Sequence, residues 1–121
     1  MSIAEAYLTA FALGAGVSTA GFWTWVLATG RLDSLIAPRR AALNHVAAEF
    51  LTAILLLGAG IAMLVAIDVA WSRVLMGIAL GALVYALFGS PGLYEDRRVL
   101  IAFAVGWIFA IPAIVLLFTS S

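Results

Sequence analysis

The sequence predicts an all-helical membrane protein, an antiparallel bundle of four transmembrane helices forming one domain over residues 1–121. The chain is 66% hydrophobic, against roughly 45–50% apolar residues in an ordinary soluble domain. Its six basic and six acidic residues are grouped so that four long runs carry no charge. Each run is close to the roughly 20 residues that cross a bilayer. The runs are Ala6–Gly30, Phe50–Ile67, Val74–Tyr94 and Val99–Ser121.

The runs are apolar on all sides, without the alternation of a membrane β-barrel, so we expect helices. The expected spans are about 6–29, 43–67, 70–89 and 97–118. The first span follows Met-Ser-Ile-Ala-Glu, which has no basic segment. It is also longer than the apolar core of a signal peptide, so we expect it to remain in the mature protein.

Residues typical of helix ends agree with these spans. Gly30 can end the first helix, and Pro38 suits the first turn of the second. Asp68 can cap the third helix, and Ser90-Pro91-Gly92 can end it. The connections are short, which favours antiparallel neighbours.

Arginine predicts the orientation, because basic residues concentrate on the cytoplasmic side and acidic residues contribute little. The loops after the first and third helices hold five arginines, whereas Arg73 lies at the opposite side. We therefore expect both termini outside the cytoplasm of a cell (inner) membrane. Four arginines are expected at lipid headgroups, with an anionic ligand as the alternative. They are Arg39, Arg40, Arg97 and Arg98.

Small residues recur along single helical faces, and they allow close helix packing in lipid. Examples are Gly77-x-x-x-Gly81, Gly58 with Ala62 and Ala66, and Gly106 with Ala102 and Ala110. We expect Gly77, Gly81, Gly58 and Gly106 to pack helices within the chain or to build a homo-oligomer. A membrane-protein partner is the alternative to a second copy.

Tyr85 and Trp107 fall inside the third and fourth spans. Their polar atoms need partners there, so we expect them either to line a cavity or to bond to the next helix. Pro112 leaves the carbonyl of Ile108 without its helical donor, which could kink the fourth helix.

The candidate polar site opens the second helix. His45, Glu49 and Thr52 share one helical face, directly after Asn44. Such a group could relay protons or bind a cation. However, Glu49 lies about 28 Å before Asp68 at 1.5 Å per residue, close to the roughly 30 Å of hydrocarbon. Two alternative interpretations therefore remain: an interfacial polar cluster of these residues with the arginines, and a metal or cofactor site.

Most enzyme classes are excluded by the residue inventory. The chain has no cysteine, which excludes thiolate zinc sites, iron–sulfur clusters and a redox dithiol. One His and one nearby carboxylate cannot complete a zinc or di-iron site in a monomer, although several copies of His45 and Glu49 in an oligomer could. We expect no catalytic residues, no cofactor and no nucleic-acid partner.

The segment His45-Val46-Ala47-Ala48-Glu49-Phe50-Leu51-Thr52-Ala53, together with Ser90-Pro91-Gly92, resembles an uncharacterised group of short four-helix prokaryotic membrane proteins. The resemblance covers about two thirds of the chain. In that group an aromatic residue directly follows the glycine, and here Leu93 intervenes before Tyr94. The resemblance implies the fold and assigns no catalytic residue.

Three functions from different classes remain. The first is an oligomeric channel or carrier for a proton, small cation or small solute, using His45, Glu49 and Thr52. The second is a non-catalytic accessory or assembly subunit of a larger membrane complex. The third is a lipid, quinone or metal binding protein. Transport ranks first because His45 and Glu49 share a helical face.

Overall fold

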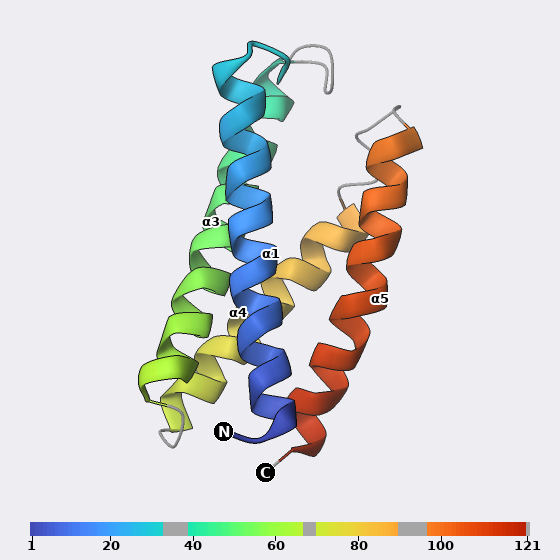
Figure 1. Ribbon diagram of the computed structural model, residues 1–121. Helices are drawn as coiled ribbons and strands as arrows, with labels where there is room; N and C mark the ends of the chain where they lie inside the picture. Colours follow the sequence, from blue (N-terminus) through green and yellow to red (C-terminus); the bar gives the residue numbers. More distant parts are fainter. Residues whose placement is uncertain (33–38, 67–69, 90–96, 121) are drawn as a thin grey trace.

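The computed structural model describes residues 1–32, 39–66, 70–89 and 97–120. Its helices, labelled as in Figure 1, are α1 Ile3–Ala28, α3 Arg39–Val65, α4 Ala70–Gly89 and α5 Arg97–Thr119. All four are long and apolar enough to cross a membrane. Consecutive helices run antiparallel, and both chain termini lie at the same end of the bundle (Figure 1). The predicted all-helical class is thus confirmed for the described residues.

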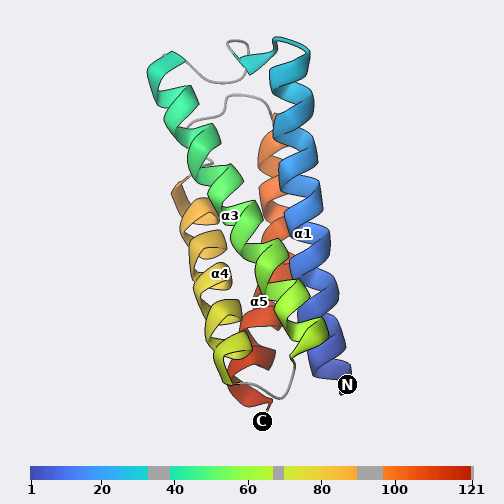
Figure 2. The ribbon, with the colours of Figure 1, turned by 90° about the vertical axis from the view of Figure 1, so that its left-hand side faces the viewer.

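We call the end with both termini the terminal end, and the opposite end, where α1 finishes and α5 begins, the arginine end. The helices form a ring in which α1 contacts α3 and α5, and α4 contacts the same two helices. Figure 2 shows the ring from the side on which α3 and α4 lie next to each other. The contact between α1 and α3 is the most extensive, and α5 is held least.

Helix α1 begins at Ile3, three residues before the expected start. A capping box explains the difference: the Glu5 amide donates to the Ser2 hydroxyl (3.1 Å), and the Ser2 amide donates to the Glu5 carboxylate (2.9 Å). The charge of Glu5 marks the limit of the apolar run, but two satisfied backbone donors let the helix begin earlier. Helix α3 likewise begins at Arg39, before the expected residue 43.

Gly30 ends α1 as predicted. Its φ of 67° is the left-handed conformation that glycine adopts without strain. The Gly30 amide donates to the Leu27 carbonyl (3.3 Å), and the Arg31 amide donates to the Val26 carbonyl (3.1 Å). This is the Schellman arrangement, which satisfies the last carbonyls of the helix. The other predicted end signals, Pro38, Asp68 and Ser90-Pro91-Gly92, lie outside the described residues.

Two glycines bring α1 and α3 into close contact. A Cβ atom at Gly16 would lie 2.7 Å from Leu57 Cγ, and one at Gly60 would lie 2.7 Å from Leu13 Cγ. Each leucine therefore occupies the space that a glycine leaves open. Close van der Waals contact of this kind can hold helices together even where lipid supplies no hydrophobic drive between them.

The four glycines expected to pack helices divide into two groups. A Cβ at Gly106 would lie 3.1 Å from Leu87, and one at Gly77 would lie 3.6 Å from Leu117, so both face a neighbouring helix. Gly58 and Gly81 are exposed, and a Cβ there would meet nothing within 4 Å. Gly77 and Gly81 thus do not form one contact within the chain, because Gly81 lies on the exposed face of α4.

Helix α5 is anchored at the terminal end. Arg73 of α4 donates to the Leu117 carbonyl (3.1 Å) and the Ser120 carbonyl (2.6 Å), which complements the negative end of the α5 dipole. Tyr7 of α1 donates to the Phe109 carbonyl (2.8 Å), within one turn of Pro112. In α5, all of which the structure describes, the buried residues are Ala110 and Ala113. The half nearer the arginine end therefore contributes little to the core.

Candidate functional site

His45 and Glu49 form a buried pair, as their spacing on α3 predicts. His45 Nε2 lies 3.5 Å from Glu49 Oε1, and the two side chains are 9% and 10% exposed. The His45 ring also packs edge-on against Trp23 of α1, with the ring centroids 5.4 Å apart. The pair therefore lies inside the bundle, between α1 and α3.

The other two members of the predicted polar group do not join this pair. Thr52 is buried, but its hydroxyl donates to the Ala48 carbonyl one turn earlier in the same helix (3.0 Å). Asn44 is exposed. Of the predicted polar group, His45 and Glu49 thus contact each other, whereas Thr52 does not join them. The reason is that a helix offers a threonine hydroxyl its own backbone as an acceptor.

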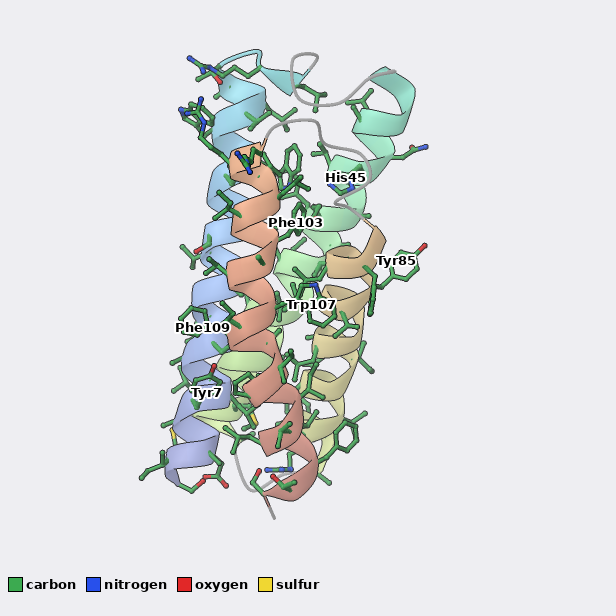
Figure 3. All side chains as sticks on the ribbon, turned by 90° about the vertical axis from the view of Figure 1, so that its right-hand side faces the viewer. Tyr7, His45, Tyr85, Phe103, Trp107 and Phe109 are labelled. Atoms are coloured by element: carbon green, nitrogen blue, oxygen red, sulfur yellow. The ribbon has the colours of Figure 1, made fainter. Side chains whose placement is uncertain are left out.

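The two aromatic candidates take different positions. Tyr85 is 82% exposed and points away from the bundle (Figure 3), so it does not find the expected place inside the bundle. Its exposure follows from helical phase, since it lies on one stripe with Val74, Ile78 and Gly81, all exposed. Trp107 packs edge-on against Phe88 of α4, with the ring centroids 4.9 Å apart.

The arginine candidates also differ in their positions. Arg97 and Arg98 are exposed at the start of α5. The side chains of Arg39 and Arg40 lie outside the described part of the structure. Arg98 lines a crevice together with Glu49, and Arg97 does not form part of its wall. One predicted headgroup arginine therefore lines the same crevice as Glu49, one member of the predicted polar pair.

Residues of several helices form this crevice. It has a volume of about 900 Å³ and is partly open. Its walls come from α1, α4 and α5, with Glu49 reaching it from α3. In Figure 1, α1 and α5 lie close together at the terminal end and separate towards the arginine end.

Small residues open the crevice and aromatic residues line it. On α1, Ala10, Gly14 and Ser18 follow one another at steps of four, and on α5, Ala102 and Gly106 face the same space. A Cβ at Gly14 would meet nothing within 4 Å. The aromatic side chains in the wall are Phe11, Phe22, Trp23, Trp25, Phe103 and Phe109.

Polar side chains in the crevice are concentrated towards the arginine end. Arg31 and Arg98 line it there, and the Arg31 guanidinium lies over the Trp25 ring at 5.0 Å from the centroid. Figure 3 shows Phe103 and His45 at a similar level of the bundle, further from the arginine end than the start of α5. Towards Phe109 the wall becomes apolar. The crevice is therefore amphipathic along its length.

Spacing on α3 indicated the His45–Glu49 pair, but the crevice and Arg31 were missed. In the sequence, Arg31 is one of the five arginines that predict the orientation, and nothing there marks it as a binding residue. A signal was present in the sequence, because Ala10, Gly14 and Ser18 place three small side chains on one face of an apolar helix. That pattern does not say whether a neighbouring helix fills the space.

Fold and site together define a bundle of four membrane-length helices with an amphipathic crevice in its side. The chain belongs to the family described as Domain of unknown function (DUF8058), which it matches over residues 3–121. Comparison with curated proteins and with solved structures found no match. The expectation of an uncharacterised group is consistent with this family.

Proposed function

We propose that this protein resides in a cell membrane and binds an elongated, largely apolar molecule that enters the crevice sideways from the bilayer. The crevice of about 900 Å³ between α1, α4 and α5 is the observation that carries the proposal. Both termini lie outside the cytoplasm in this proposal, because Arg31, Arg97 and Arg98 gather at the opposite end. This is the lipid or quinone binding function that the sequence left open.

The size and lining of the crevice support binding. Ligand sites typically enclose roughly 300–1,000 Å³ and combine apolar and aromatic walls with a few polar groups. Here the polar groups are Glu49, Arg31 and Arg98, with the hydroxyls of Ser18 and Thr19. A hollow in the side of a membrane helix bundle faces acyl chains, so a partly apolar occupant reaches it without crossing water.

The matched test compares two glycine substitutions that differ in whether the new side chain enters the crevice. Gly14 and Gly58 are both exposed and helical, with nothing within 4 Å of an added Cβ, and only Gly14 lines the crevice. We expect Gly14→Leu to lower the amount of lipid or quinone that co-purifies in nanodiscs about tenfold, equivalent to about 1.4 kcal/mol. Mass spectrometry of the extracted molecules measures it. Equal amounts in Gly14→Leu and Gly58→Leu would sink the proposal.

A proton or cation carrier is the second candidate, favoured by the buried contact between His45 and Glu49. Between this pair and the terminal end, the main core cluster of one protomer is apolar and includes Leu8, Leu56 and Met63. The buried hydroxyls of Thr9 and Thr52 donate to carbonyls of their own helices. A conducting path would therefore run through the crevice or between copies in a homo-oligomer. Flux into liposomes that is the same for wild type and Glu49→Gln would reject this candidate.

Metal binding receives less support. Within the described ranges, no three His, Asp or Glu side chains gather into a group that could hold a metal ion. A metal site would require His45 and Glu49 from several copies of the chain.

A further inference from the structure

We propose that the occupant of the crevice is a membrane lipid with an anionic headgroup, its phosphate held by Arg31 and Arg98 and one acyl chain lying along the small-residue walls. This inference rests on the proposed binding function and names the class of ligand. The lipid comes from the leaflet at the arginine end.

The turn after α1 positions Arg31. The Arg31 amide is bonded to the Val26 carbonyl, and Gly30 holds the left-handed conformation that reverses the chain. The guanidinium stacks on Trp25, which itself lines the crevice. A guanidinium binds an aromatic ring through its face and a phosphate through its edge, so the stack orients Arg31 and is compatible with phosphate binding.

Arg98 approaches the same space from the opposite wall. It lies in the first turn of α5, and together with Val99, Ala102 and Phe103 it forms that side of the crevice. Among the described residues, the formally charged ones that line the crevice are Arg31, Arg98 and Glu49. Glu49 also has His45 at 3.5 Å, outside the crevice wall. Two guanidinium groups that line one end of the crevice favour an anionic headgroup there, because a guanidinium binds a phosphate through its edge.

The length of the crevice matches one leaflet. The α5 wall from Arg98 to Phe109 spans about 16 Å at 1.5 Å per residue, and half of the hydrocarbon core is about 15 Å. A lipid with its phosphate at the arginine end would therefore place the end of its chain near Phe109. At that level the helices close, because Tyr7 of α1 is bonded to the Phe109 carbonyl.

The small residues explain how a chain fits between two helices. Gly14 and Ser18 of α1 and Ala102 of α5 all line the crevice and carry little or no side chain. An acyl chain between them contacts helix backbone on both sides, which is the close packing that small residues otherwise provide to a partner helix. Aromatic side chains that line the crevice, such as Phe11 and Phe103, supply further apolar contact area.

The test offers the intact protein an equimolar mixture of phosphatidylglycerol and phosphatidylcholine with identical acyl chains in nanodiscs. We expect native mass spectrometry to show about tenfold preferential retention of phosphatidylglycerol. Arg98→Gln should lower the preference several-fold, whereas Arg97→Gln should leave it unchanged. Arg97 is the matched control, because it is exposed in the same turn of α5 but lies outside the crevice wall.

Each outcome has a separate meaning. Equal retention of both lipids overturns the inference but leaves the binding function standing, whereas no retained lipid removes the binding function as well. An equal effect of Arg97→Gln and Arg98→Gln assigns the preference to surface charge and also overturns the inference. Excess inorganic phosphate should not displace the lipid, because the chain is bound too, so displacement argues for a headgroup-only site. If Arg98→Gln does not fold, Arg98→Lys replaces it in the test. This variant keeps the charge, and we expect it to retain part of the preference for phosphatidylglycerol.

Discussion

Gly14 and Gly16 lie two residues apart on α1, yet they face opposite surroundings. At Gly16 an added Cβ would collide with Leu57 of α3, whereas at Gly14 it would meet nothing within 4 Å. The α1–α3 contact is closed because a large side chain enters each glycine gap. Between α1 and α5, small residues face small residues, and Leu87 of α4 takes the space beside Gly106. Small residues therefore seal a contact only when the partner helix supplies a side chain to fill them.

The largest expected effect separates these two glycines directly. Gly16→Leu must displace Leu57 and approach the Ala53 carbonyl, which lies 3.1 Å from the added Cβ. We expect a loss of about 3 kcal/mol in the free energy of unfolding, at the upper end for an overpacked core. Gly14→Leu should change it by less than about 1 kcal/mol, since its side chain enters the crevice. Denaturant unfolding in detergent compares the two, and equal losses would contradict the distinction.

The next effect concerns the anchor of α5. Arg73→Gln removes charged hydrogen bonds to the carbonyls of Leu117 and Ser120, and hydrogen bonds to charged groups contribute about 1.5–3 kcal/mol. We expect faster amide hydrogen exchange in α5, with exchange in the α1–α3 contact unchanged. Arg97→Gln at the other end of α5 is the control. Uniformly faster exchange throughout the bundle would show that the two contacts are one cooperative unit.

A smaller effect is expected at the point where the crevice closes. Tyr7→Phe keeps the ring and removes the hydroxyl that donates to the Phe109 carbonyl. A single hydrogen bond of this kind contributes about 0.5–1.5 kcal/mol. Exchange at amides around Pro112 should increase, and the crevice should admit longer acyl chains, which mass spectrometry of the retained lipids can detect. An unchanged chain-length distribution would argue against Tyr7 as the limit of the crevice.

The smallest effect is expected at Tyr85, which sequence position alone made a site candidate. Tyr85→Leu should change the unfolding free energy by no more than about 0.5 kcal/mol, as is usual for exposed positions. Lipid retention should also stay at the wild-type level. A clear loss of either would place Tyr85 in a contact with a second copy of the chain.

Much of the fold could be predicted from the sequence because charge is costly in hydrocarbon. The charged residues delimit four apolar runs, and the helices lie within a few residues of the expected spans. Capping at Ser2 and Glu5 extended α1 beyond the charge limit, since hydrogen bonding and not hydropathy sets a helix end. The Schellman turn at Gly30 was predictable for the same local reason.

The site was predictable only in part. His45 and Glu49 are one turn apart on one helix, so their contact follows from local geometry. The exposure of Tyr85 and the packing of Trp107 against Phe88 depend on the rotation of α4 and α5. A run that is apolar on all sides carries no marker of the face that turns inward, because lipid and protein interior are equally apolar.

Local chemistry accordingly specifies the helices, the turn after α1 and the His45–Glu49 contact. The crevice depends on the relative placement of three helices, and the same small residues at Gly14 and Gly16 yield a hollow in one case and a sealed contact in the other. The physical reason is that packing in lipid relies on shape complementarity between helices, which no single segment contains.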